Sequence, residues 1–133
     1  IGIAPLLYLV KNLENKCDFY AGFAKDPYYM EEFESYANKV VTTSDLYDKK
    51  FITDAINPHD YDYIYACGPN PMLKSLYEKA KDIPMEVSME AHMACGIGAC
   101  LGCTIEKSDG EFLRVCKDGP VFDSEEVFGW ILK

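Results

Sequence analysis

The chain has 133 residues, and its 22 acidic and 13 basic side chains give a net charge of −9. Hydrophobic residues at 49% and aromatic residues at 14% are enough to build a packed core, which excludes a disordered tail, a collagen-like rod and a disulfide miniprotein. The acidic balance argues against a nucleic-acid ligand, and the apolar stretch over residues 1–10 is too short to cross a bilayer.

Helices and strands are predicted to alternate in the first half of the chain. A helix opens at Ala4 and Pro5, where proline is favoured, and apolar side chains recur at helical spacing as far as Asn15. Asp26 and Pro27 form a second helix-start signal. The other elements predicted in this half are strands over residues 17–24 and 39–43 and a short helix over residues 51–56.

The same alternation continues to residue 90. We predict a strand over residues 61–66, a helix that begins at Asn70 and Pro71, and a strand over residues 84–89. The inward face of this helix is predicted to consist of four residues, Leu73, Leu76, Tyr77 and Ala80. Strands and helices that alternate over short connections are typical of a parallel sheet covered on both faces. Residues 1–90 are therefore predicted to form a doubly wound α/β domain.

Residues 91–133 are predicted to form a separate cysteine-rich subdomain. A hairpin of residues 101–106 and 112–116 is expected around the turn at residues 108–110, followed by an aromatic tail that ends at Trp130. Four of the six cysteines gather in this subdomain. Such crowding at one end favours reduced, intracellular cysteines over a secreted disulfide scaffold.

The spacing of these four cysteines is the sharpest signal in the sequence. Cys95, Cys100 and Cys103 follow the pattern C-x4-C-x2-C, and Cys116 comes after twelve more residues, which is the plant-type spacing for a [2Fe–2S] cluster. The intervening glycines and alanines suit this reading, because small residues let backbone N–H groups approach the sulfurs. A structural zinc site is the alternative, but zinc usually takes two short-spaced pairs, and only Cys100 and Cys103 form one.

Two turns are candidates for holding a nucleotide. Residues 67–72, Cys-Gly-Pro-Asn-Pro-Met, follow an apolar strand and open a helix, and residues 2–5, Gly-Ile-Ala-Pro, run into the first helix. In open α/β sheets ligands bind beyond the carboxyl ends of the strands, where helix N-termini offer free N–H groups. Each turn by itself is equally consistent with an ordinary tight turn. No acid–base catalyst is indicated, since His59 and His92 lack a suitable setting.

The chain resembles the C-terminal half of the electron-transfer subunits of two-subunit, NAD-linked dihydroorotate dehydrogenases, within the ferredoxin-reductase superfamily. Residues 2–5, residues 67–72 and the long stretch 89–122 carry the resemblance, which extends over nearly the whole chain. It implies a ferredoxin-reductase NAD-binding fold followed by a [2Fe–2S] subdomain. The cluster ligands that it implies are Cys95, Cys100, Cys103 and Cys116.

The resemblance also implies nucleotide contacts. Near the dinucleotide phosphates it places Gly2, Ala4 and Pro5. At the nicotinamide end it places Cys67, Gly68, Pro69, Asn70 and Met72. Ribose recognition would fall to Ser44 and Asp45, although Leu46 stands where the family usually has a glycine.

Two features differ from that family. Its members carry an FAD-binding β-barrel and a longer glycine turn ahead of the position matching Gly2, whereas this sequence begins at Ile1. We therefore expect a fragment whose sheet lacks its first strand. Such a fragment should bind NADH weakly and lack most contacts to FAD.

The function implied by the resemblance is electron transfer between NAD(H), FAD, the [2Fe–2S] cluster and the flavin of a dihydroorotate dehydrogenase catalytic subunit, in cytoplasmic pyrimidine biosynthesis. No membrane or nucleic-acid partner is expected. One alternative is the small subunit of a ferredoxin-linked NADP reductase or sulfide dehydrogenase. Another is a non-catalytic, zinc-stabilised interaction domain, which only the cysteine cluster supports.

The docking surface for the catalytic subunit is expected beside the cysteines. Ile97 and Leu101 are the preferred candidates, because a tight ligand loop leaves its intervening side chains pointing outward. The further apolar candidates are Val121, Phe122, Phe128 and Trp130. For the aromatic residues among them, packing onto this domain is the favoured alternative, because large apolar groups are seldom exposed without a partner. The tyrosines, by contrast, are expected to pack rather than to stack on bases; they include Tyr28, Tyr29, Tyr61, Tyr63 and Tyr65.

Overall fold

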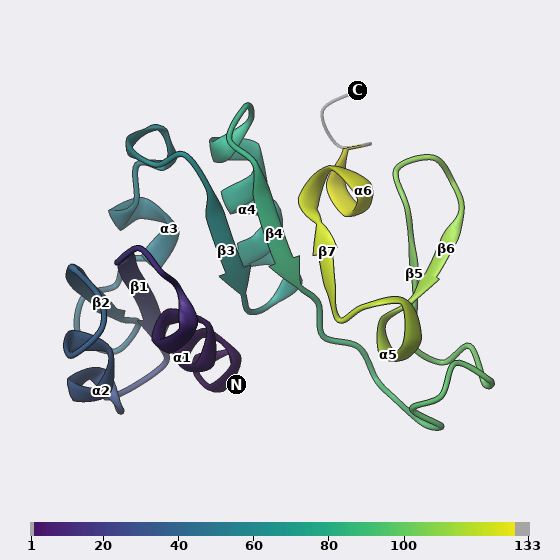
Figure 1. Ribbon diagram of the computed structural model, residues 1–133, viewed down its shortest axis with the longest axis horizontal. Coiled ribbons are helices and arrows are strands. Elements are labelled where there is room, and N and C mark those ends of the chain that lie inside the picture. The colour runs from purple at the N-terminus through teal and green to yellow at the C-terminus, as the bar shows by residue number, and fades with distance from the viewer. Residues whose placement is uncertain (1, 130–133) are drawn as a thin grey trace. The chain divides into compact units, whose positions relative to one another are not determined.

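The computed structural model describes residues 2–129 and contains two compact units. Unit 1 ends at Asn57, and unit 2 begins at Pro58. Both units combine helices with strands (Figure 1), which confirms the predicted α/β class. The predicted parts, residues 1–90 for the nucleotide and residues 91–133 for the cluster, divide the chain at a different place and stay a prediction.

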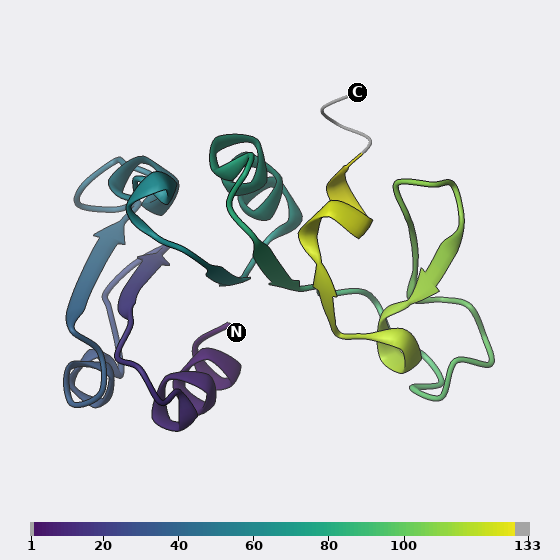
Figure 2. The ribbon, with the colours of Figure 1, turned by 45° about the horizontal axis from the view of Figure 1, so that its top comes forward.

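Unit 1 contains a two-stranded parallel sheet. Its elements are α1 (Ile3–Asn12), β1 (Asp18–Phe23), α2 (Met30–Glu34), β2 (Lys39–Ser44) and α3 (Ile52–Ala55). Strands β1 and β2 lie side by side in parallel, with Phe19 opposite Val40 (Figure 2). The rings of Phe19 and the fully buried Phe33 stack with their centroids 3.7 Å apart. This aromatic pair fixes α2 against the sheet.

Unit 2 is built around a three-stranded sheet in the order β3-β4-β7. Its elements are η1 (Pro58–Asp60), β3 (Ile64–Cys67), α4 (Asn70–Ala80), β4 (Met85–Ser88), β5 (Thr104–Glu106), β6 (Phe112–Arg114), α5 (Val115–Asp118), β7 (Val121–Asp123) and α6 (Ser124–Phe128). Strands β3 and β4 are parallel, whereas β7 pairs with β4 in the antiparallel direction. Strands β5 and β6 form a separate antiparallel hairpin.

Helix α4 shows why these residues form a core. Its buried residues are the four that the sequence predicts, Leu73, Leu76, Tyr77 and Ala80. They recur at intervals of three and four positions, so they share one face of a helix. Met85 and Val87, which alternate along β4, are almost fully buried in the same unit. Apolar burial of this kind supplies most of the stability of a small domain.

The structure corrects three predictions in unit 2. The strand predicted over residues 61–66 begins only at Ile64, because the Tyr61 N–H donates to the Pro58 carbonyl at 3.1 Å and closes a turn. Cys116, expected on the second hairpin strand, lies in the one-turn helix α5. The region expected as an aromatic tail contains β7 and α6. Trp130 lies outside the described residues.

Within residues 2–129, no helix combines the length and apolar character needed to cross a membrane.

Candidate metal centre

The four clustered cysteines come from two neighbouring segments of unit 2. Cys95 and Cys100 lie in the loop between β4 and β5, Cys103 directly precedes β5, and Cys116 is the second residue of α5. The Val115 N–H donates to the Cys103 carbonyl at 3.1 Å. This bond holds α5 beside the end of the loop, as Figure 1 shows. All four cysteines are free thiols.

The thiols form two pairs. The Cys100 N–H donates to the Cys95 sulfur at 3.4 Å, and the Cys116 N–H donates to the Cys103 sulfur at 3.4 Å. Over residues 2–129, no three His, Cys, Asp or Glu side chains converge on a point where they could hold one metal ion. Four cysteine thiolates in two pairs are the donor set that the two irons of a [2Fe–2S] cluster require. The residues therefore fit a binuclear iron–sulfur cluster.

Backbone N–H groups in the loop point at the cysteine sulfurs. Cys95 Sγ accepts hydrogen bonds from Ala99 at 3.3 Å, Cys100 at 3.4 Å and Ile97 at 3.5 Å. Cys100 Sγ accepts one from Gly102 at 3.4 Å. The Cys100 N–H, followed by the Ile97 N–H, lowers the pKa of the Cys95 thiol to about 6. The loop is thus built to stabilise a thiolate, which is the form that binds metal.

The second pair is differently placed. Cys103 is only 3% exposed, and its sulfur accepts a hydrogen bond from the Cys116 N–H at 3.4 Å. That N–H lowers the pKa of the Cys103 thiol. The Cys103 side chain, by contrast, raises the pKa of Cys116. Two neighbouring thiols titrate as a pair, which explains these opposite directions.

The predicted nucleotide residues of unit 1 lie at two element ends. Gly2, Ala4 and Pro5 form the start of α1, and Ser44 ends β2. The buried Ser44 hydroxyl donates to the Lys25 carbonyl at 2.8 Å, so it is engaged inside the unit. Asp45, the next residue, is exposed. Of the two residues predicted to recognise ribose, Asp45 therefore carries the accessible polar group.

The predicted nucleotide residues of unit 2 connect β3 to α4. Pro69 and Asn70 are exposed at the start of the helix. A Cβ at Gly68 would lie 2.6 Å from Cε of Met72, so the turn packs closely on that side chain. Burial raises the pKa of the Cys67 thiol, and a hydrogen bond with Ser88 partly opposes this. These residues are brought together within unit 2, and their contact with a nucleotide stays a prediction.

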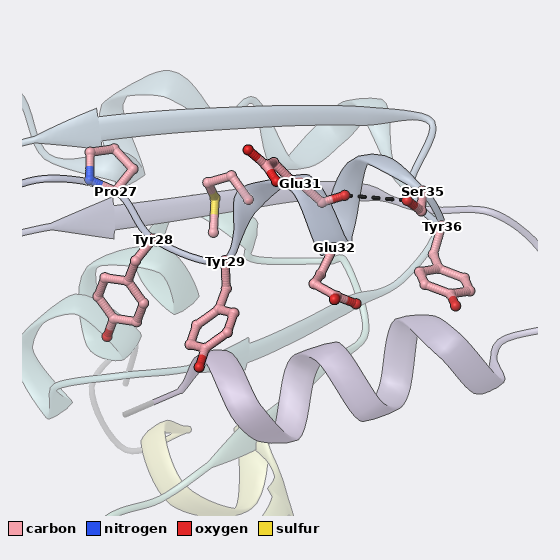
Figure 3. Close-up of a pocket in the computed structure, with 8 residues that line it drawn as sticks. Pro27, Tyr28, Tyr29, Glu31, Glu32, Ser35 and Tyr36 are labelled. Carbon is pink, nitrogen blue, oxygen red and sulfur yellow. Dashed lines mark hydrogen bonds between the residues drawn. The ribbon is translucent and has the colours of Figure 1, made fainter.

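A surface groove in unit 1 has a volume of about 780 Å³ (Figure 3). Its lining comes from residues 27–36: Pro27, Tyr28, Tyr29, Met30, Glu31, Glu32, Ser35 and Tyr36. Tyr28 and Tyr29 are at least half exposed, and the Tyr28 ring packs edge-on against the buried Phe23 with ring centroids 5.2 Å apart. Lys11 of α1 reaches Glu32 at 3.1 Å and lies over the Tyr36 ring. None of the predicted nucleotide residues lines this groove.

The apolar residues expected at a docking surface fall into two groups. Ile97 and Leu101 are 74% and 63% exposed, and Val121 is also exposed. Phe122 and Phe128 are buried in unit 2, which confirms packing onto the domain, the alternative expected for the aromatic residues, and excludes them from the docking surface. Both belong to short elements, β7 and α6, that pack within the unit and were not foreseen. Trp130 is not among the residues that the structure describes.

Comparison with known proteins agrees with the cysteine geometry. Residues 90–128 match the family described as the iron-sulfur cluster binding domain of dihydroorotate dehydrogenase B. The chain is 43% identical over 133 residues to the dihydroorotate dehydrogenase B (NAD(+)) electron transfer subunit of Clostridium acetobutylicum. It is 42% identical over 137 residues to that of Clostridium perfringens. The chain belongs to the family of these electron transfer subunits.

The matches cover 96% of this chain but 54% and 55% of these two relatives. The chain thus spans about half the length of the curated relatives it matches. A solved structure, titled as an NADH-dependent reduced ferredoxin-NADP oxidoreductase in flavin-based electron bifurcation, is similar with a TM-score of 0.80 and 28% identity. That similarity covers 99% of this chain and 52% of the other. The fold is therefore shared with a ferredoxin-NADP reductase type of protein.

Sequence reasoning missed the polar residues that surround Cys116. The Arg114 side chain donates to Asp118 through Nε at 2.9 Å and through Nη2 at 3.0 Å. This contact lowers the pKa of Asp118 to about 2. The spacing of an arginine and an aspartate four residues apart, with Cys116 between them, was the available signal.

Proposed function

We propose that this chain supplies the [2Fe–2S] site of an electron transfer subunit that works with a dihydroorotate dehydrogenase catalytic subunit in pyrimidine biosynthesis. Electrons would pass between NAD(H), an FAD, the cluster and the flavin of the catalytic subunit. The observation that carries this proposal is the arrangement of two cysteine pairs, Cys95 with Cys100 and Cys103 with Cys116, each joined by a backbone N–H that donates to a sulfur. Similarity to dihydroorotate dehydrogenase B (NAD(+)) electron transfer subunits supports the assignment of the reaction.

The chain's own residues would act by holding and insulating charge. Cys95, Cys100, Cys103 and Cys116 would bind the cluster as thiolates. When bound, a [2Fe–2S] cluster takes up and returns one electron at a time. The N–H groups aimed at Cys95 and Cys100 stabilise negative charge on the sulfurs without supplying a proton. No acid–base residue is required for this role.

The nucleotide-binding role rests on the residues at strand ends. Gly2, Ala4, Pro5, Ser44 and Asp45 in unit 1, and Cys67, Gly68, Pro69, Asn70 and Met72 in unit 2, are proposed to contact NAD. The proposed fold is a doubly wound sheet, supported by two parallel pairs, β1 with β2 and β3 with β4. Residues 1–90 would serve the nucleotide and residues 91–133 the cluster. FAD contacts would lie mostly on other parts of the subunit.

Several features support a cytoplasmic location. All six cysteines are free, and a cluster held by thiolates requires reduced cysteines. We accordingly propose that the protein acts in the cytoplasm, where thiols stay reduced.

A second candidate function, a component of a ferredoxin-linked NADP reductase, is favoured only by the structural similarity at 28% identity. The dihydroorotate system is preferred because its subunits are more than 40% identical over 96% of the chain.

Docking of the catalytic subunit is proposed at Ile97 and Leu101, since both side chains are exposed beside ligand cysteines. In the complete two-subunit enzyme, Ile97→Asp and Leu101→Asp should leave the cluster absorption and NADH-driven FAD reduction intact. They should lower dihydroorotate:NAD⁺ activity and subunit association. Phe112→Asp is a matched control, because Phe112 is equally exposed but lies on β6, outside the loop. Unchanged activity and association in both loop variants would place the docking surface elsewhere.

A further inference from the structure

The cluster ligands come from two segments, three cysteines from the loop and the fourth from α5. The loop and α5 must therefore be held together for all four cysteines to bind one cluster. Near Cys103 the two segments are held together by two hydrogen bonds. The Val115 N–H donates to the Cys103 carbonyl, and the Cys116 N–H donates to the Cys103 sulfur. These bonds fix Cys116 next to Cys103. They leave open what holds the outer part of the loop, where Cys95 and Cys100 lie, at a fixed position relative to α5.

Gly98 is the point where the outer loop meets α5. Its φ of +79° lies in the left-handed region, and a Cβ there would come within 2.7 Å of Lys117 Cδ. The backbone of Gly98 therefore packs directly on the helix that carries Cys116. Packing of this kind has no fixed direction. A further, directional contact is therefore needed to hold the loop in place against α5.

Arg114 supplies such a contact. Its backbone N–H donates to Asp118 Oδ2 at 2.8 Å, and its Nε and Nη2 bind the two carboxylate oxygens. The remaining nitrogen, Nη1, donates to the Gly98 carbonyl at 3.5 Å. This last bond is long, but the guanidinium is planar and is already oriented by Asp118, so little further ordering is needed to form it.

We propose that Arg114, oriented by Asp118, is a positioning residue that holds the cluster loop onto α5 through the Gly98 carbonyl. The inference rests on the proposed [2Fe–2S] function. Arg114 touches no cluster ligand side chain through these bonds, so it acts through Gly98 and the position of Cys116. Its positive charge also lies near Cys103 and Cys116, where it would favour the more negative, reduced form of a bound cluster.

The geometric and electrostatic parts of this role can be separated by two substitutions. Arg114→Met removes both the planar guanidinium with its several N–H donors and the positive charge. Arg114→Lys keeps the charge and removes the guanidinium. Lys81→Met is the matched control, because Lys81 is an exposed cation of the same unit on the turn after α4. It removes the same net charge away from the cysteines.

The measurement is the loss of visible absorption when an iron chelator is added to the anaerobically purified full chain. Replacing a residue that supports metal ligands typically costs about 10–100-fold in metal affinity, so Arg114→Met should lose the cluster at least about tenfold faster than wild type. Arg114→Lys should also lose it faster, and Lys81→Met should match wild type. The reduction potential should fall in Arg114→Met and stay near wild type in Arg114→Lys, which a purely structural role would not produce.

Each other outcome overturns a definite statement. If wild type holds a cluster and both Arg114 variants lose it at the wild-type rate, the positioning role is wrong and the proposed function stands. If wild type holds no iron, the proposed function fails and takes the inference with it. Should Arg114→Met not fold by circular dichroism, Asp118→Asn decides in its place: faster cluster loss supports the role, and wild-type behaviour contradicts it.

Discussion

The sheet with α4 and the cysteine loop are two parts of unit 2 that hold their shape by different means. In the first part, Leu73 of α4 and Val87 of β4 are completely buried, and Met85 of β4 is nearly so. In the loop, no residue between Glu90 and Gly102 is buried. The loop relies instead on N–H groups bonded to sulfur and on the Arg114 contact. Burial can stabilise the sheet without a ligand, whereas the loop should depend on one.

The largest effect should come from removing a ligand. Cys103→Ser should reduce bound iron to near zero, because the substitution takes away the buried thiolate that is paired with Cys116. Iron analysis and circular dichroism measure the two regions separately. The helical signal should persist, since α4 does not depend on the loop. Cys17→Ser, in unit 1, is the control and should keep its iron; iron retained in Cys103→Ser would contradict the ligand assignment.

A cavity in the sheet region should produce the opposite pattern. Leu73→Ala should lower the free energy of unfolding by about 2–5 kcal/mol, the usual loss for a fully buried leucine. Urea denaturation measures this loss. Iron per folded chain should stay at the wild-type level. If Leu73→Ala stays folded and nevertheless loses its cluster, the two regions are not independent as argued.

Two glycines of the loop offer a finer comparison. Gly96 and Gly98 both have positive φ values, +69° and +79°, so alanine should cost about 1–2 kcal/mol of local strain at either position. Open space surrounds a Cβ at Gly96, whereas one at Gly98 meets Lys117. Cluster loss to a chelator should therefore be faster in Gly98→Ala than in Gly96→Ala. Equal rates would mean that contact with α5 at this position does not matter.

The smallest effect concerns the hydrogen bond between α4 and α6. The Tyr77 hydroxyl donates to Glu125, and burial together with this bond raises the pKa of Tyr77 from 10 to about 12. The unfolded chain releases this proton at lower pH than the folded chain, so unfolding becomes easier as pH rises from about 10 to about 12. In urea denaturation between pH 9 and 12, Tyr77→Phe should lose less stability than wild type. An identical decline in both proteins would contradict the assignment.

The sheet region could be predicted from the sequence because its signals are local. The spacing of Leu73, Leu76, Tyr77 and Ala80 defines a helix face without knowledge of its partner. The spacing of Cys95, Cys100 and Cys103 likewise lies within one short segment. Both features follow from neighbours in the chain.

The elements around Cys116 could not be predicted in the same way. Helix α5 has four residues and β7 has three, too few for a periodic pattern. Strand β7 is defined by pairing with β4, more than 30 positions earlier in the chain. The contact of Arg114 with Gly98 likewise depends on the loop folding back onto α5. Such features arise from tertiary contacts that override local signals.

The content of iron and acid-labile sulfide in the anaerobically purified chain tests the central claim most directly. Two thiol pairs that hold a [2Fe–2S] cluster predict iron and sulfide in equal amounts, about two of each per chain, with visible absorption. One zinc per chain without sulfide would contradict the account, because the four cysteines would then form a structural site with no role in electron transfer.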